Sequence, residues 1–279
     1  MCLPVSLWKL IRGEHGVLAA LASTASYAVA GGNNAATLVL LAASTFLAQA
    51  GLFAHNDLSN LEEDRVNRPD APLVSGRVSL ATARAVAYGS LVAGAACAAT
   101  LGLAPLSVYL TAAVLGVLYN VRLKRVPVVG NLIVAFLTSM TYIYGMAAAG
   151  RLSDVLMLLF ASSLVANVGR EFVKTAMDYQ GDMRAGLKTL AVLIGPQKTA
   201  AVGGLVTAAS AALGVWLVMD SASTGLYALA AGAGLTSALL VYMAYLALRG
   251  QWRTYRNGTL AAFGITLIAL VAEAAWRLF

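Results

Sequence analysis

The chain has 279 residues, of which 60% are hydrophobic and only 11% are charged, and its mean hydropathy is +0.78. This composition excludes a soluble globular protein, whose surface would need more charged residues, and indicates a protein embedded in a lipid bilayer. The net charge of +7 does not predict nucleic-acid binding, because the basic residues lie between hydrophobic runs rather than on one soluble face. Lipid headgroups and phosphorylated compounds are the expected counter-charges.

Apolar runs of bilayer length recur along the whole chain. A helix that crosses the hydrocarbon core needs about 20 apolar residues, and these runs are too long for the strands of a membrane β-barrel. The segment before the first run does not resemble a cleavable signal, so the first helix is expected to be retained. The prediction is an all-α integral membrane protein with nine transmembrane helices in a bundle, at residues 16–31, 36–55, 80–101, 105–121, 128–149, 153–175, 197–219, 223–248 and 258–278.

The distribution of basic residues predicts the orientation of this bundle. If the N-terminus is inside, every one of the 19 Lys and Arg residues except Arg151 and Arg277 falls on the cytoplasmic side. The positive-inside rule produces this asymmetry, and a missed or extra helix would disrupt it. We therefore expect a multi-pass protein of the cell membrane with a cytoplasmic N-terminus, a C-terminus outside and its polar chemistry toward the cytoplasm.

The chain is predicted to form a single transmembrane domain over residues 1–279. Its two long internal connections, at 56–79 and 175–196, follow the second and the sixth predicted helix. Each of these helices is the second of a group of four. Residues 10–125 and 126–250 are therefore candidates for a parallel repeat of four helices, with the ninth helix as an addition.

The first long connection begins with side chains that are rich in oxygen atoms. Asn56, Asn60 and Asp64 are four residues apart, so they would share one face of a continuing helix, with Asp57 at the edge of that face. Oxygen ligands suit hard cations, and proteins usually hold Mg²⁺ through a few carboxylates together with phosphate oxygens of a substrate. This segment is a candidate site for Mg²⁺ and a diphosphate.

The second long connection begins in a similar way. Glu171, Lys174, Asp178 and Asp182 follow the same facial spacing at the end of the predicted helix 153–175. One isolated cluster would be typical of a solvated helix end, but two at matching positions repel each other unless a cation or a basic partner compensates. Two facing clusters would suit a diphosphate that is bridged by Mg²⁺.

Three segments of the chain together resemble the UbiA superfamily of intramembrane prenyltransferases. The segment NDLSNLEEDRVNRPDAPLVSG, at residues 56–76, is similar to the NDxxDxxxD motif of that superfamily and its NRP and SG continuation. REFVKTAMDYQGDMRAGLKTL, at 170–190, resembles the second Asp-rich motif, and YNVRLKRVPVVGN, at 119–131, resembles the basic loop after the fourth helix. One departure is Asn60, which stands where the first motif usually has Asp. An amide oxygen can ligate a cation but brings no negative charge.

The resemblance implies that a prenyl group is transferred from an allylic diphosphate to an acceptor, with Mg²⁺ as cofactor. The implied catalytic residues are Asp64, Asp178 and Asp182, which would hold Mg²⁺ together with Asn56 and Asn60. Further side chains would bind the diphosphate or the acceptor: Arg12, Asp57, Arg68, Tyr119, Lys124, Arg125, Asn131, Lys174 and Lys188. The apolar interior of the bundle would exclude the water that quenches an allylic carbocation.

The sequence leaves the acceptor open. The three segments look most like the archaeal lipid branch of the superfamily, the digeranylgeranylglyceryl phosphate synthases, which attach a geranylgeranyl chain to geranylgeranylglyceryl phosphate. The alternative acceptor is 4-hydroxybenzoate or a related quinone precursor. A transporter of anionic lipids or metabolites would also be a basic-inside bundle, but transporters tend to bind near the bilayer midplane on broken helices. No oligomeric state is predicted.

Overall fold

The computed structural model describes residues 3–184 and 186–278, and within them it contains helices and connecting segments but no strand. Its long helices are α2 (Gly13–Val29), α3 (Ala35–Ser59), α5 (Leu80–Thr100), α6 (Leu103–Val121), α7 (Val129–Ala149), α8 (Asp154–Arg184), α10 (Pro196–Ser223), α11 (Tyr227–Leu248) and α12 (Trp252–Leu278). The short helices, none of which was predicted, are α1 (Leu3–Ile11), α4 (Leu61–Asn67), the 3-10 helix η1 (Leu123–Arg125) and α9 (Leu190–Ile194).

Eight of the helices in the described part of the chain are long and apolar enough to cross a bilayer. They are α3, α5, α6, α7, α8, α10, α11 and α12, and they correspond to the predicted spans from 36–55 onward. The all-α membrane bundle is therefore confirmed. The first predicted span, 16–31, corresponds to α2, which has 17 residues. Helix α8 continues past the predicted end at residue 175 and reaches Arg184.

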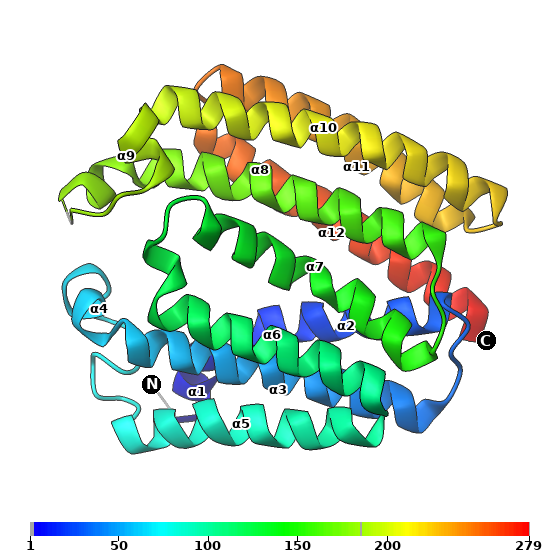
Figure 1. Ribbon diagram of the computed structural model, residues 1–279, viewed down its shortest axis with the longest axis horizontal. Helices are drawn as coiled ribbons and strands as arrows, with labels where there is room; N and C mark the ends of the chain where they lie inside the picture. Colours follow the sequence, from blue (N-terminus) through cyan, green and yellow to red (C-terminus); the bar gives the residue numbers. More distant parts are fainter. Residues whose placement is uncertain (1–2, 185, 279) are drawn as a thin grey trace.

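The long helices lie side by side in two parts. In Figure 1, α3, α5 and α6 form the lower part of the bundle and α8, α10, α11 and α12 form the upper part, with α2 and α7 between them. Helix α2 packs against α3, α7 and α12, and α7 packs against α6 and α8. The contacts made by α2 and α7 therefore join the two parts into one bundle.

Glycines allow neighbouring helices to approach each other closely. Helices α8 and α10 meet at Gly169 and Gly203, where a Cβ atom on either glycine would lie 2.7 Å from the carbonyl oxygen of the other. A Cβ atom on Gly145 of α7 would clash with the backbone of Ser23 in α2. Inside a bilayer, helix association depends on such close packing, because lipid tails are as apolar as the side chains.

The largest apolar cluster lies at the end of the bundle away from the two acidic motifs. Its members include Met146 of α7, Leu156 of α8, Leu217 of α10, Leu229 of α11 and Leu270 of α12, each at most 2% exposed. The C-terminus is also at this end (Figure 1). The far end of the bundle is therefore closed by packed side chains, while the opposite end carries the long polar segments.

Candidate active site

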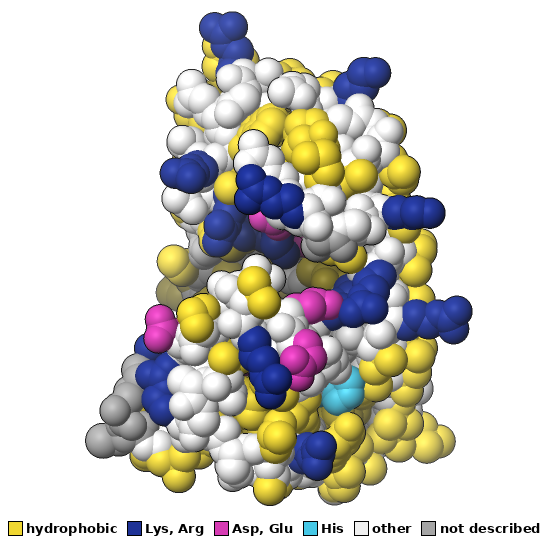
Figure 2. Space-filling model, turned by 90° about the vertical axis from the view of Figure 1, so that its left-hand side faces the viewer, with side chains coloured by type: hydrophobic (Ala, Val, Ile, Leu, Met, Phe, Trp, Pro, Cys, Tyr) yellow, Lys and Arg dark blue, Asp and Glu magenta, His cyan; other side chains and the backbone are white. Residues whose placement is uncertain are grey.

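The segments that contain α4, η1 and α9 gather at one end of the bundle (Figure 1). Seen from that end, the molecule is hollowed between its two parts, and basic and acidic side chains lie both above and below the hollow (Figure 2). The two motifs, which are far apart in the sequence, therefore reach the same end of the molecule. This end is the candidate active site.

The first motif lies on two helices and not on one. Helix α3 ends at Ser59, Asn60 leaves helical geometry with φ −105° and ψ 9°, and α4 begins at Leu61. The expectation of one continuous helical face through Asn56, Asn60 and Asp64 is therefore wrong. The four-residue spacing persists across the break, because the N–H groups of Asn60 and Asp64 donate to the carbonyl oxygens four residues earlier, at 3.0 and 2.8 Å.

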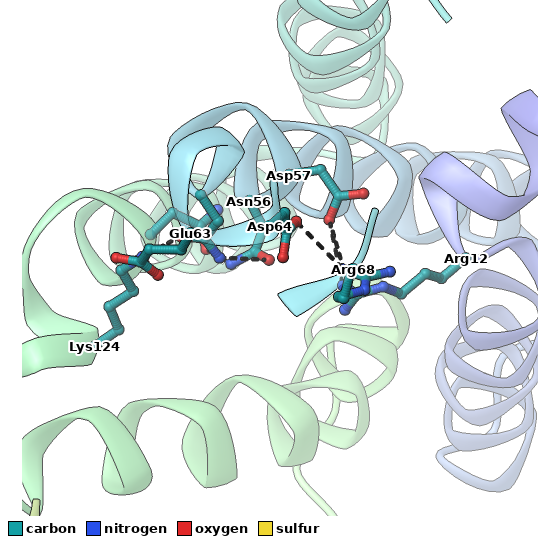
Figure 3. A network of polar contacts seen from close by, with 9 residues as sticks. Arg12, Asn56, Asp57, Glu63, Asp64, Arg68 and Lys124 are labelled. Carbon is teal, nitrogen blue, oxygen red and sulfur yellow. Dashed lines mark hydrogen bonds and ion pairs between the residues drawn. The ribbon is translucent and has the colours of Figure 1, made fainter. Parts of the chain in front are cut away.

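Two arginines from different segments hold the carboxylates of the first motif (Figure 3). Nη2 of Arg12 lies 3.3 Å from Oδ1 of Asp57. Nη1 of Arg68 lies 3.7 Å from the same oxygen and 3.5 Å from Oδ2 of Asp64. Both acids are buried, and the side chain of Asp57 is only 2% exposed. Because a buried carboxylate is costly unless it is paired, both acids depend on these arginines.

Arg12 reaches this position through an unusual backbone conformation. It lies between α1 and α2 with φ 47° and ψ 58°, in the left-handed region that residues with a side chain rarely adopt. Its guanidinium carbon lies 4.5 Å from the centre of the Phe53 ring, a cation–π contact. Such strain persists only where the surroundings hold it, and it is typical of functional sites. The strained turn brings the Arg12 side chain to Asp57.

Amide side chains connect α6 to the first motif and the basic loop. Nδ2 of Asn120 lies 3.2 Å from Nδ1 of His55, and Oδ1 of Asn120 accepts a hydrogen bond of 2.9 Å from Asn56. Oδ1 of Asn56 in turn accepts one of 3.3 Å from Asn60. Lys124 of η1 donates to Oδ1 of Asn60. The amides of the first motif are therefore oriented by two other segments of the chain.

Glu63 joins α4 to the basic loop. Its carboxylate lies 2.8 Å from Nη2 of Arg125 and 3.4 Å from Nζ of Lys124. Burial by itself would raise the pKa of Glu63, but the hydrogen bonds and charges of Arg125 and Lys124 outweigh it, so the pKa lies below its ordinary value. Glu63 therefore stays ionised at neutral pH and holds both cations of the loop beside the first motif.

The second motif lies on the single helix α8, as the sequence predicts. Glu171 is buried and binds two cations: Nη1 of Arg170 lies 3.5 Å from Oε1, and Nζ of Lys174 lies 3.4 Å from Oε2. Asp178 and Asp182 follow toward the end of the helix. Neither of these two acids forms an ion pair with another side chain of the described residues.

The remaining predicted residues lie around the second motif. Asn131, near the start of α7, donates a hydrogen bond of 3.0 Å to Oγ1 of Thr175 and so joins α7 to α8. Tyr119 is partly buried near the end of α6 and lies within electrostatic range of Glu171. Lys188 is exposed in the segment between α8 and α9.

The carboxylates of the two motifs do not form a ready-made metal cage. Within residues 3–184 and 186–278, no group of three or more His, Cys, Asp or Glu side chains could hold a metal ion. That the two acidic clusters face each other across a diphosphate stays a prediction. Asp64 is paired with the basic side chain of Arg68.

Several side chains at this end were missed by sequence reasoning. Glu63 had a local signal, because it follows Asn60 by three residues, the spacing of a helix-capping box. Asn120 and Arg170 are polar residues inside the predicted transmembrane helices 105–121 and 153–175. A polar residue at such a place is a functional signal in membrane proteins. Arg256 of α12, which lies within electrostatic range of Asp178, had no such signal.

The arrangement is suited to a polyanionic ligand. Four cations surround the first motif: Arg12, Arg68, Lys124 and Arg125. Guanidinium and ammonium groups are the usual partners of phosphate oxygens. Each of the four is held by an acidic or amide side chain of α3 or α4, so its position is set before a ligand arrives. The carboxylate and amide oxygens between them are ligand types that Mg²⁺ accepts.

Comparisons with known proteins agree with this reading. The chain matches the UbiA prenyltransferase family over residues 17–277. It is 36% identical over 214 residues to the digeranylgeranylglyceryl phosphate synthase of Methanoculleus marisnigri, covering 75% of this chain and 77% of that protein. It is 32% identical over 260 residues to the synthase of the same name from Methanopyrus kandleri, covering 93% and 94%.

A solved structure shows the same fold. The UbiA homolog from Archaeoglobus fulgidus bound to GPP and Mg²⁺ is 21% identical to this chain and superimposes with a TM-score of 0.75, over 98% of this chain and 99% of that one. The three segments that carry the sequence resemblance all fall inside the residues that match the family. The chain belongs to the UbiA prenyltransferase family, and it is a multi-pass membrane prenyltransferase.

Proposed function

We propose that this enzyme catalyses the Mg²⁺-dependent transfer of a geranylgeranyl group from geranylgeranyl diphosphate to geranylgeranylglyceryl phosphate. The proposed donor, a prenyl diphosphate, is supported by the four cations held around the first motif, which suit a diphosphate. The proposed acceptor is supported by the two relatives named digeranylgeranylglyceryl phosphate synthase.

The side chains of the two motifs fit a Mg²⁺ ion in their chemistry. Asp64, Asp178 and Asp182 offer carboxylate oxygens, and Asn56 and Asn60 offer amide oxygens. Mg²⁺ usually takes one or two protein carboxylates and completes its shell with water and substrate phosphates, and this donor set can supply them. The Archaeoglobus fulgidus homolog bound to GPP and Mg²⁺ supports the same assignment. When bound, Mg²⁺ would neutralise charge on the leaving diphosphate.

The basic side chains around the first motif act on the leaving group. Arg68 and Lys124, which contact Asp64 and Asn60 in this structure, would donate to the diphosphate oxygens. As the C–O bond of the donor breaks, negative charge collects on these oxygens, so the hydrogen bonds to them strengthen in the transition state. Asp57 would remain buried and would hold the guanidinium groups of Arg12 and Arg68 in position for the diphosphate.

The allylic carbocation that is left behind must meet the acceptor before it meets water. The bundle is closed at its far end by the apolar cluster around Leu156 and Leu270, which limits the access of water from that side. Tyr119, near the end of α6, is the aromatic side chain that we assign to stabilise the cation through its ring. The acceptor hydroxyl then forms an ether bond to the prenyl carbon and releases its proton, and diphosphate leaves.

We place the active site on the cytoplasmic side of the cell membrane, in a single domain whose nine crossings comprise α2 and the eight candidate spans. This orientation puts every Lys and Arg except Arg151 and Arg277 on the cytoplasmic side. In sealed vesicles with the outer face exposed, an impermeant thiol reagent should label the variant Asp220→Cys at its new cysteine but should not label the new cysteine of Gly76→Cys. The reverse labelling would overturn the orientation.

A direct comparison of two acceptors tests the proposed reaction. The purified enzyme in lipid nanodiscs receives geranylgeranyl diphosphate and Mg²⁺ with either geranylgeranylglyceryl phosphate or 4-hydroxybenzoate, and kcat/KM is measured for each acceptor. We expect ether formation on the glyceryl lipid and no prenylation of the phenol. Efficient prenylation of the phenol, with the lipid ignored, would overturn the proposed acceptor but not the membership of the family.

A further inference from the structure

A second group of basic side chains lies on α8 and α12, two helices of the upper part of the bundle (Figure 1). Buried Glu171 holds Arg170 at 3.5 Å and Lys174 at 3.4 Å. Arg256 of α12 lies within electrostatic range of Arg170, and α8 packs against α12. Three cations therefore gather near buried Glu171, and Asp178 lies within electrostatic range of Lys174 and Arg256.

Arg170 carries a hydrogen-bond donor that the protein itself does not use. Its side chain is 16% exposed, and its Nε atom is buried without a hydrogen-bond partner. Buried polar atoms are nearly always paired, so an unpaired one is expected to bind an ordered water or a ligand group. The guanidinium geometry matches phosphate, because neighbouring N–H groups can donate to two oxygens of one phosphate group.

The position of Arg256 is set by its neighbour Tyr255. Tyr255 is fully buried, and its hydroxyl lies 2.6 Å from Oγ1 of Thr207 on α10. Its ring packs in the cluster that contains Val173 of α8. Because Tyr255 is anchored to α8 and α10, the backbone of Arg256 is fixed beside α8, while its side chain is exposed and accessible to a ligand.

The depth of this group along the helices suits the phosphate of a lipid. Arg256 lies about one turn into α12, whose first residue is Trp252, and tryptophan is typical of the membrane interface. Arg170 lies two turns before Asp178 on α8, which places it about 12 Å closer to the far end of the bundle. Arg170 and Lys174 therefore lie nearer the hydrocarbon than Asp178 and Asp182, which follow them on α8.

We propose that Arg170, Lys174 and Arg256 bind the phosphate monoester of the lipid acceptor. This inference rests on the proposed function, because it requires an acceptor that carries a phosphate. The diphosphate of the donor has its own cations around the first motif, which leaves these three for the phosphate of the acceptor. Glu171 is a positioning residue here, because it holds Arg170 and Lys174 and would not itself contact the phosphate.

The test compares Arg256→Gln with Arg253→Gln, which removes the same charge from an exposed residue on the same helix. Initial rates are measured in phosphatidylcholine nanodiscs while the concentration of geranylgeranyl diphosphate or of geranylgeranylglyceryl phosphate is varied. Arg256→Gln should raise the KM of the acceptor about tenfold, the loss expected for one charge-assisted hydrogen bond, and leave the KM of the donor unchanged. Arg256→Lys should restore part of the loss, and Arg253→Gln should change neither constant.

A second acceptor shows whether the phosphate itself is recognised. The wild-type enzyme should prefer the phosphorylated glyceryl lipid to the corresponding alcohol, and Arg256→Gln should lose most of that preference. Arg170→Gln should have the same effect. If this buried substitution prevents folding, the exposed Arg256 variants still decide the matter.

Each contrary result has a distinct meaning. An unchanged acceptor KM in folded Arg256→Gln, or an equal rise in the donor KM, would overturn the inference and leave the proposed function standing. A defect in Arg256→Gln that depends on added phosphatidylglycerol and not on acceptor concentration would assign the group to bilayer headgroups and so contradict the inference. Failure of the wild-type enzyme to use geranylgeranylglyceryl phosphate would overturn the proposed function and the inference together.

Discussion

Nη2 of Arg12 and Oδ1 of Asp57 lie 3.3 Å apart although 45 positions separate the two residues in the sequence. The pair joins the turn between α1 and α2 to the end of α3, and Arg68 shares the same carboxylate oxygen at 3.7 Å. One buried carboxylate thus positions two guanidinium groups, and Arg68 is shared with Asp64 at 3.5 Å. Both guanidinium groups are therefore held in place where a diphosphate could accept their hydrogen bonds.

Replacing Arg12 by Ala should weaken donor binding and destabilise the fold. We expect the KM for geranylgeranyl diphosphate to rise about tenfold or more, because a charged hydrogen bond is lost. We also expect the free energy of unfolding to fall by about 1–3 kcal/mol, because buried Asp57 keeps only Arg68 as a partner. Steady-state kinetics and thermal unfolding measure the two effects. Arg84→Ala, an exposed change on α5, is the control, and an unchanged donor KM in Arg12→Ala would contradict the assignment.

Restoring an acid at position 60 should strengthen metal binding. Asn60→Asp adds a negative charge close to Asn56 and next to the ammonium group of Lys124. The Mg²⁺ concentration that gives half-maximal activity should fall several-fold, because a carboxylate attracts the cation more strongly than an amide does. Gln197→Glu adds the same charge on the exposed first turn of α10 and should have no effect. An unchanged or higher Mg²⁺ requirement in Asn60→Asp would count against a metal ligand at this position.

Glu63 should contribute a stability that depends on pH. Its pKa in the folded protein lies below the ordinary value, so its contribution is complete above the unfolded-state pKa and is lost as the pH falls through the lower folded-state pKa. The side chain of Glu63 is 49% exposed, so solvent screening limits the contribution to about 1 kcal/mol or less.

Thermal unfolding of wild type and Glu63→Gln in detergent measures this contribution. The difference in the free energy of unfolding should be present near neutral pH and should vanish as the pH falls through the lowered folded-state pKa of Glu63. A difference that grows as the pH falls would show that Glu63 is not held as an ion pair with Arg125 and Lys124.

Packing between α8 and α10 should not tolerate a methyl group at Gly169. The added Cβ would lie 2.7 Å from the carbonyl oxygen of Gly203, so Gly169→Ala should lower the free energy of unfolding by about 1–3 kcal/mol. Gly181→Ala on the same helix is the matched control, because a Cβ atom added at Gly181 would meet no neighbouring helix or side chain within 4 Å, and it should be neutral or stabilising by up to about 1 kcal/mol. Equal unfolding temperatures for the two variants would argue against close contact between α8 and α10.

The membrane bundle could be predicted because apolar length is a local property of the chain. Hydropathy could not predict that α8 continues through the polar second motif to Arg184, because this last part of the helix is not apolar. The break at Asn60 had a local signal in the spacing to Glu63, although the side chain of Asn60 makes no capping hydrogen bond. A strict four-residue spacing across Asn60 favoured a continuous helix instead.

The candidate site could be predicted only where its residues share one segment. Asn56 and Asp64 stand out by their spacing, but the bond from Asn56 to Asn120 joins α3 to α6 across 64 positions. Such pairs depend on how helices pack, and a single sequence does not record that. For the same reason, the sequence indicated Arg12 as a cation for phosphate but not its partnership with Asp57.

We propose that both acidic motifs serve one metal-dependent prenyl transfer. The most direct measurement is the rate at which wild type, Asp64→Asn and Asp178→Asn convert geranylgeranyl diphosphate and geranylgeranylglyceryl phosphate to digeranylgeranylglyceryl phosphate, each with Mg²⁺ and with a chelator. We predict that wild-type activity disappears with chelator and returns with Mg²⁺. Each variant should unfold at nearly the wild-type temperature yet turn over at least about a hundredfold more slowly. Full activity in both variants, or wild-type transfer that ignores the chelator, would contradict the claim.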